Sequence, residues 1–171
     1  MPLTGLANAA IDRVAPDPAA FAATLAVYAE TDLLCYRAAA PAQLVEREAQ
    51  TWDPLLAWAR ARYDVAFEVV TGLVHRPQPE ATVRRLSAAL AALDPFGLAA
   101  MSPLVTIGGS LVTALAVAEG RIGAQDAFDA THLDELWQAE QWGEDALAVE
   151  ARESRRRDFA AGARLLSLVA G

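Results

Sequence analysis

The sequence predicts a mainly all-α protein, a helical bundle built around one buried apolar helix. Aromatic residues make up only 7% of the 171 residues, while alanine and leucine dominate, and these two residues favour helices over sheets. A helix-capping residue stands directly before a proline at four places, as is typical of helix starts. With 54% hydrophobic residues the chain can bury a core without disulfides. We therefore expect a single helical domain over residues 1–171.

The four predicted helix starts have the same physical basis. The side-chain oxygen of the capping residue accepts a hydrogen bond from an unpaired backbone N–H, and the proline that follows has no N–H to leave unpaired. The predicted starts are Asp17-Pro18, Asp53-Pro54, Asp94-Pro95 and Ser102-Pro103.

Apolar spacing locates the helices of the N-terminal half. After Asp17, the residues Phe21, Leu25 and Tyr28 follow at steps of four and three and line one helix face. We expect further helices from near residue 41, over residues 54–63, and from residue 80 onward. Between them, apolar and other residues alternate over Val65–Val70, which predicts one short extended segment.

Leu98–Ala118 has no charged residue and is long enough to raise the alternative of a membrane span. A start at Pro103 shortens its helix to about 16 residues, or about 24 Å. Two glycines, a proline and four hydroxyl residues also dilute its hydrophobicity. We therefore predict a buried central helix over residues 103–118, without membrane insertion.

Two helices complete the chain. The first is expected from about Gln125 to Gln141 and ends at Gly143, because glycine commonly follows a helix end. The second covers roughly Asp145–Val169.

The charge of the chain argues against nucleic-acid binding. The formal net charge is −8, which repels phosphate backbones and anionic lipids. The basic run Arg155-Arg156-Arg157 is flanked by acidic residues and is interpreted as a solvated helix face. All 14 basic residues are arginine, a bias typical of a GC-rich and so bacterial genome. The first residues lack the pattern of a secretory signal.

Residues with catalytic potential are few. Cys35 is the only cysteine, and the two histidines, His75 and His132, have no neighbouring nucleophile in the sequence. His132 and Glu135 share a helix face, yet a metal site in a helical bundle needs this element twice. We predict no catalytic triad and no metal site. The four tryptophans Trp52, Trp58, Trp137 and Trp142 fit a core, with interface anchors as the alternative.

Three segments together resemble the assembly chaperones for the alpha subunit of the F-type ATP synthase, the "ATP twelve" family. They are residues 31–37 (TDLLCYR), 52–59 (WDPLLAWA) and 133–143 (LDELWQAEQWG). The opening residues 2–8 and the closing residues 157–161 also suit that family. The likeness extends over nearly the whole chain.

The resemblance implies a function. Such a chaperone binds the unassembled alpha subunit and shields its apolar interface until it meets beta, without catalysis or a cofactor. It would act in the cytoplasm of a bacterium, and in the mitochondrial matrix in eukaryotic relatives. Residues 1–171 would correspond to the family's helical C-terminal domain, with the β-rich N-terminal domain absent.

The resemblance also suggests partner-binding residues. Asp134, Glu135, Gln138 and Trp142 match the family's acidic, glutamine and tryptophan positions, whereas Leu136 and Glu140 are less typical of it. Glu135, Gln138 and Trp142 fall on one helix face, and we expect the Glu135 carboxylate to meet a basic residue of the alpha subunit. We expect Leu133, Leu136 and Trp137 to turn toward the core. The alternative is a helical enzyme or ligand-binding domain that uses the side chains of Cys35, His132 and Glu135.

Overall fold

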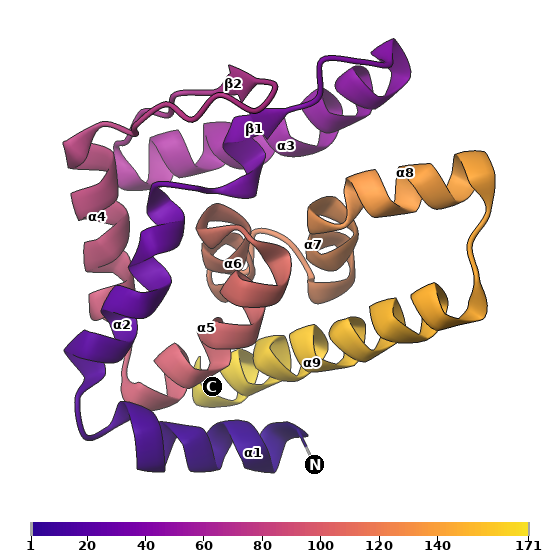
Figure 1. Cartoon of the computed structure of the whole chain (residues 1–171). Helices are drawn as coiled ribbons and strands as arrows, with labels where there is room; N and C mark the ends of the chain where they lie inside the picture. The colour runs from indigo at the N-terminus through magenta and orange to yellow at the C-terminus, as the bar shows by residue number, and fades with distance from the viewer. Residues whose placement is uncertain (1, 171) are drawn as a thin grey trace.

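A computed structural model describes residues 2–170 of the chain (Figure 1). Nine α-helices and one pair of two-residue strands form within this range, which confirms the mainly all-α prediction. The elements are α1 (Pro2–Ala9), α2 (Pro18–Ala26), β1 (Tyr36–Arg37), α3 (Ala42–Tyr63), β2 (Val70–Thr71), α4 (Glu80–Ala91), α5 (Pro95–Gly108), α6 (Leu111–Ala118), α7 (Ala124–Thr131), α8 (Leu133–Trp142) and α9 (Ala146–Ala170).

Two of the four capped starts are confirmed. The Asp17 carboxylate accepts a hydrogen bond from the Ala20 N–H at 3.1 Å and opens α2. The Asp94 carboxylate accepts one from the Gly97 N–H at 2.7 Å and opens α5. In both helices proline follows the cap, as expected for a first-turn residue.

The other two predicted starts are wrong. Helix α3 runs unbroken through Pro54, and α5 runs unbroken through Pro103. A proline inside a helix removes a hydrogen bond at a cost of about 3 kcal/mol. Burial offsets this cost, because side chains on both sides of each proline lie in the core: Trp52 and Leu55 in α3, and Met101 and Leu104 in α5.

The predicted central helix over residues 103–118 is also wrong. Gly109 has φ +68°, a left-handed conformation that ends α5. Ser110 then starts α6, and its hydroxyl accepts a hydrogen bond from the Thr113 N–H at 3.0 Å. The apolar stretch is therefore two short helices. None of the helices in the described chain is long and apolar enough to cross a membrane.

The expected extended segment is shorter than predicted. Only Val70–Thr71 forms a strand, paired in parallel with Tyr36–Arg37. Over residues 65–69, backbone N–H groups donate hydrogen bonds to side chains and not to a neighbouring strand. The Ala66 N–H donates to Thr82 Oγ1 at 3.2 Å, and the Glu68 N–H donates to Gln78 Oε1 at 2.8 Å. This stretch is thus held by side chains and makes no ladder.

The predicted helix from Gln125 to Gln141 is divided in two at His132, whose φ of −106° and ψ of 20° lie outside the helical range. The His132 ring stacks on Phe128 at 3.8 Å between centroids, and its Nδ1 lies 2.9 Å from the Phe128 carbonyl oxygen. This packing fixes the corner between α7 and α8. The helix end predicted at Gly143 is confirmed.

The core lies where α5 and α6 meet α9. Met101, Leu104, Leu111 and Phe159 are fully buried there. A Cβ at Gly162 would lie 2.6 Å from the Ala100 carbonyl oxygen, so glycine allows α9 to approach the backbone of α5. Helix α9 passes below α5 to α7, and α8 runs above it at one side of the molecule (Figure 1).

Candidate functional site: the surface between α8 and α9

Helix α8 buries one face and exposes another. Leu133 and Trp137 are buried, as predicted. Leu136 is only half-buried, so the expectation that it turns fully into the core is wrong. All four predicted partner-binding residues are exposed: Asp134, Glu135, Gln138 and Trp142.

Three of those four residues line one depression. Glu135, Gln138 and Trp142 meet Glu144 and Arg152 around a hollow of about 270 Å³, at the turn that joins α8 to α9. The one-face expectation for these three residues therefore agrees with the geometry.

Asp134 lies elsewhere, beside Glu48 of α3. Glu48 is 1% exposed, and its Oε1 accepts a hydrogen bond from the Ala38 N–H at 2.8 Å. Burial, with a smaller contribution from the neighbouring Asp134 carboxyl, raises the pKa of Glu48 to about 7. Asp134 therefore belongs to the contact between α3 and α8 and does not line the depression.

Glu135 is already paired within the chain. Arg155 Nη2 donates to both of its carboxylate oxygens, at 2.7 and 2.9 Å, and Arg152 Nη1 lies 3.5 Å from Oε2. Arg152 in turn binds Glu144 through two hydrogen bonds of 2.6 and 2.8 Å. This bond lowers the pKa of Glu144 and raises that of Arg152. A partner's cation at Glu135 would have to share the carboxylate with these arginines.

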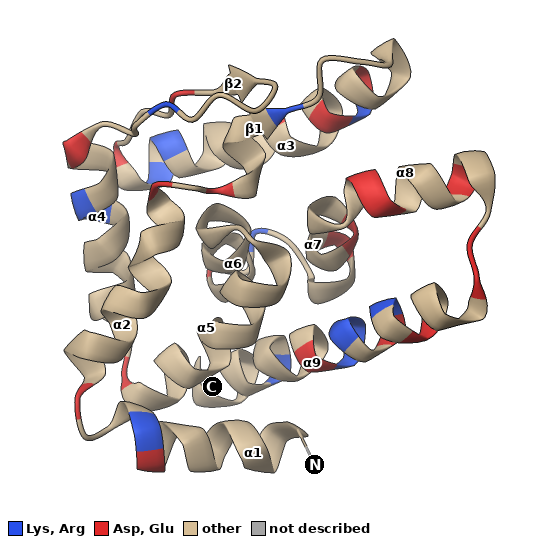
Figure 2. Cartoon of the chain, in the orientation of Figure 1, with Lys and Arg blue, Asp and Glu red and all other residues tan. Residues whose placement is uncertain are grey.

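Sequence reasoning missed Arg152 and misassigned Arg155 and Arg156. Arg152 is almost fully buried. Arg156 lies over the Phe128 ring, 4.4 Å from its centroid, and 3.1 Å from Asp129. Two residues of the run expected to be a solvated face thus hold α9 against α7 and α8. Figure 2 shows these basic bands on α9 below the acidic bands of α8.

The tryptophans divide between core and surface. Trp52 and Trp137 are buried, and Trp52 Nε1 donates to the Ala130 carbonyl at 2.8 Å. Trp142 is 75% exposed, so the core interpretation is wrong for this residue. Its ring packs edge to face with that of Trp137, with 5.7 Å between the ring centroids. Leu147, across the turn, is 78% exposed. Trp142 and Leu147 are both exposed apolar side chains near the turn that joins α8 to α9.

The residues of the enzyme alternative do not form one site. Burial, together with the nearby Asp32 carboxylate, raises the pKa of the Cys35 thiol to about 12, so the thiol is neutral and a poor nucleophile. Burial lowers the pKa of His132. Within residues 2–170 no hydrogen bond joins Cys35 to His132 or Glu135, and no group of metal-ligating side chains is found.

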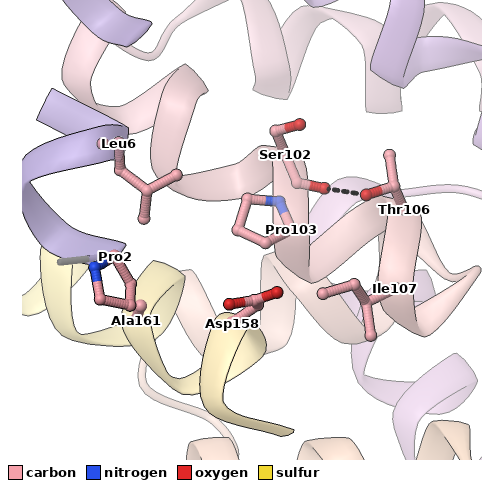
Figure 3. A pocket seen from close by; sticks show the side chains of 9 residues that line it. Pro2, Leu6, Ser102, Pro103, Thr106, Ile107, Asp158 and Ala161 are labelled. Carbon is pink, nitrogen blue, oxygen red and sulfur yellow. Dashed lines mark hydrogen bonds between the residues drawn. The ribbon is translucent and has the colours of Figure 1, made fainter. Parts of the chain in front are cut away.

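A second hollow, of about 340 Å³, lies between α1, α5 and α9 (Figure 3). Pro2 and Leu6 of α1 face Pro103 and Ile107 of α5 across it, with Asp158 of α9 as its one charged lining residue. None of the residues predicted to bind a partner lies there.

Comparisons with known proteins point to one family, through a family model for the N-terminal third and through solved structures for nearly the whole chain. A family model described as ATP12 chaperone protein matches residues 1–60. The crystal structure of ATP12 from Paracoccus denitrificans is 44% identical, with a TM-score of 0.95, over 98% of this chain and 72% of that one. A point mutant of that protein is 43% identical, with the same TM-score and coverage. A proposed chaperone from Agrobacterium tumefaciens is 39% identical, with a TM-score of 0.93, over 98% of this chain and 63% of that one. At this identity and coverage, the chain belongs to the ATP12 chaperone family.

Proposed function

We propose that this chain is an assembly chaperone that binds the unassembled alpha subunit of F-type ATP synthase and shields its interface until alpha joins beta. The observation that carries the proposal is the 44% identity to ATP12 of P. denitrificans over 98% of the chain. The chain would act as the helical domain of such a chaperone, corresponding to the family's C-terminal domain.

The surface around α8 suits a client that must later be released. Subunits of a ring have large apolar interfaces that aggregate when unpaired. A carrier needs a contact that combines apolar anchors with exchangeable polar groups. Trp142 and Leu147 are exposed apolar side chains, and Gln138 and Glu135 line the same depression as Trp142.

We assign the residues distinct roles. Trp142 inserts into the client as the apolar anchor, and Gln138 adds a neutral hydrogen bond. Glu135 holds α8 against α9 through Arg155 and offers its remaining lone pairs to a cation of the client. Asp134 supports α8 from the other side, next to Glu48. Release follows competition from beta, and the chain acts by binding without catalysis or a cofactor.

The test is co-purification of purified alpha subunit with the unmodified chain and with two variants, each of which has one side chain replaced by alanine. Trp142→Ala removes the proposed anchor and should weaken binding tenfold or more, since a buried aromatic anchor contributes about 2 kcal/mol. Leu73→Ala is the matched control, because Leu73 is a fully exposed apolar residue outside the site. Failure of the unmodified chain to retain alpha would refute the function, and equal retention by all three proteins would refute the site.

A further inference from the structure

A groove of about 340 Å³ lies between α3, α7 and α8 and has no role in the surface described above. Leu133, Leu136 and Glu140 of α8 line it. These residues follow one another at steps of three and four and so share a helix face, distinct from that of Glu135, Gln138 and Trp142. Helix α8 therefore separates two hollows.

Apolar and acidic groups make up most of the lining of this groove, and Arg47 of α3 is its basic residue. Ile122, Leu133 and Leu136 supply apolar surface, and Ile122 and Leu136 are only half-buried. An apolar side chain placed on them would remove that surface from water, which is favourable.

The acidic rim leaves one carboxylate for a partner. Glu140 is paired with Arg47 at 2.8 Å, and Asp129 with Arg156 at 3.1 Å. Asp126 of α7 also lines the groove, is exposed, and forms no ion pair within the described chain. The rim can therefore accept one additional cation, beside the apolar surface.

We propose that this groove is a second docking surface for the client, and that it takes a protein segment with one apolar side chain next to one arginine or lysine. The apolar side chain rests on Ile122 and Leu136, and the cation pairs with Asp126. Charge complementarity selects this occupant, because the free group on the rim is acidic and the chain carries a net charge of −8. The inference rests on the proposed function, and with it α8 is held by the client on two faces.

Cysteine protection tests this assignment on the full chain. Cys35 is the only cysteine and is 1% exposed, so introduced thiols can be followed individually, with the unmodified chain as the blank. Thr51→Cys places a near-isosteric thiol in the groove, Gln138→Cys places one in the depression, and Glu150→Cys places one on an exposed part of α9 that lines neither hollow. The probe is N-ethylmaleimide, and its alkylation rate is measured with and without purified alpha subunit.

The outcomes separate the two proposals. Alpha should slow alkylation at Thr51→Cys and Gln138→Cys at least fivefold and leave Glu150→Cys unchanged. Protection at Gln138→Cys alone would overturn the groove and leave the proposed function standing. Absence of protection at both positions, while the chain still retains alpha, would overturn the groove and the depression as binding surfaces and leave alpha binding itself standing. Protection of Thr51→Cys that needs no alpha and grows with chain concentration would mean that a second copy fills the groove, which also overturns the inference.

A charge reversal tests the chemistry of the occupant. Asp126→Arg should weaken alpha binding about three- to tenfold and reduce its salt dependence, because it places a cation against the client's cation. Glu150→Arg makes the same change of charge away from the groove and should have no effect. Equal affinity of the two variants would contradict a cationic occupant.

Discussion

Arg155 of α9 binds both carboxylate oxygens of Glu135 of α8, at 2.7 and 2.9 Å, across the turn at Gly143. Both bonds come from the one guanidinium nitrogen Nη2, and charge-assisted hydrogen bonds of this kind are stronger than neutral ones. The pair therefore couples the position of α8, which carries the proposed anchor Trp142, to the long helix α9 that packs on the core.

The pair predicts how substitutions at Glu135 behave. Glu135→Lys places a third cation against Arg152 and Arg155 and should lower the free energy of unfolding by about 1 kcal/mol, since the site is partly exposed and screened. The double reversal Glu135→Lys with Arg155→Glu should lose less stability than the sum of the losses in its two single variants. Urea denaturation measures both. Additive losses in the double variant would show that the pair contributes nothing to the placement of α8.

Replacing the Asp32 carboxylate by an amide should lower stability more than the Glu135→Lys substitution, although the carboxylate and amide side chains have the same shape. Its two buried oxygens accept hydrogen bonds from the N–H groups of Leu34 at 3.1 Å and Val112 at 2.8 Å. In Asp32→Asn one of these acceptors becomes an N–H donor that faces another donor, which costs about 1–3 kcal/mol. Asp12→Asn, at an exposed position of the same residue type, should change stability by less than about 0.5 kcal/mol. Similar urea midpoints for the two variants would rule out this capping role.

Two buried carboxyls predict an unusual dependence on pH. Burial raises the pKa of Asp32 from 3.8 to about 6 and that of Glu48 from 4.5 to about 7. Between these limits the folded chain binds protons that the unfolded chain does not, so stability falls as pH rises, by up to about 1.4 kcal/mol per pH unit for each group. Burial lowers the pKa of His132 from its ordinary 6.5, and this one imidazole opposes the trend at the lower end of the range. Because two carboxyls act against it, the melting temperature should be higher at pH 5.5 than at pH 7.5.

A variant assigns this pH effect to its source. Glu48→Gln cannot titrate and should flatten the rise in melting temperature between pH 7.5 and 5.5. Glu144 does not interfere in this window, because its lowered pKa means that its pair with Arg152 is lost only at more acidic pH. A Glu48→Gln protein with the full pH response would mean that Glu48 is not the group that titrates.

Adding a methyl group at Gly162 should lower the stability of the fold. A Cβ there would lie 2.6 Å from the Ala100 carbonyl oxygen and 2.8 Å from Pro103 Cγ, so Gly162→Ala must push α9 away from α5. We expect a loss of about 1–3 kcal/mol by thermal or urea unfolding. Gly5→Ala is the matched control in α1, where nothing lies within 4 Å of the added atom, and it should be neutral or stabilising by up to about 1 kcal/mol. The reverse order of stability would contradict the close approach of α5 and α9.

Local signals predicted the helix class but not every boundary. Asp17-Pro18 and Asp94-Pro95 start helices, and at each one the preceding residues do not continue the same helix. Asp53-Pro54 carries the same signal, yet Trp52 and Leu55 are buried on both sides of it, and Arg37 pairs with Asp53 at 2.8 Å. Contacts with residues distant in sequence therefore override a local capping signal. Such contacts cannot be read from the periodicity of the sequence.

The candidate site shows the same division. The spacing of Glu135, Gln138 and Trp142 predicted their common face, because that depends only on the helical repeat. The pairing of Glu135 with Arg155 depends on the turn at Gly143, and the contact of Asp134 with Glu48 depends on how α8 lies against α3. Neither relationship leaves a signal in the local sequence.

Size-exclusion chromatography of the chain with purified alpha subunit, followed by addition of beta, tests the central claim most directly. We expect the chain to co-elute with alpha alone, and beta to displace it as alpha and beta assemble. Separate elution of the chain and alpha, or a chain that stays bound after beta has joined, would show that the chain is not an assembly chaperone for alpha.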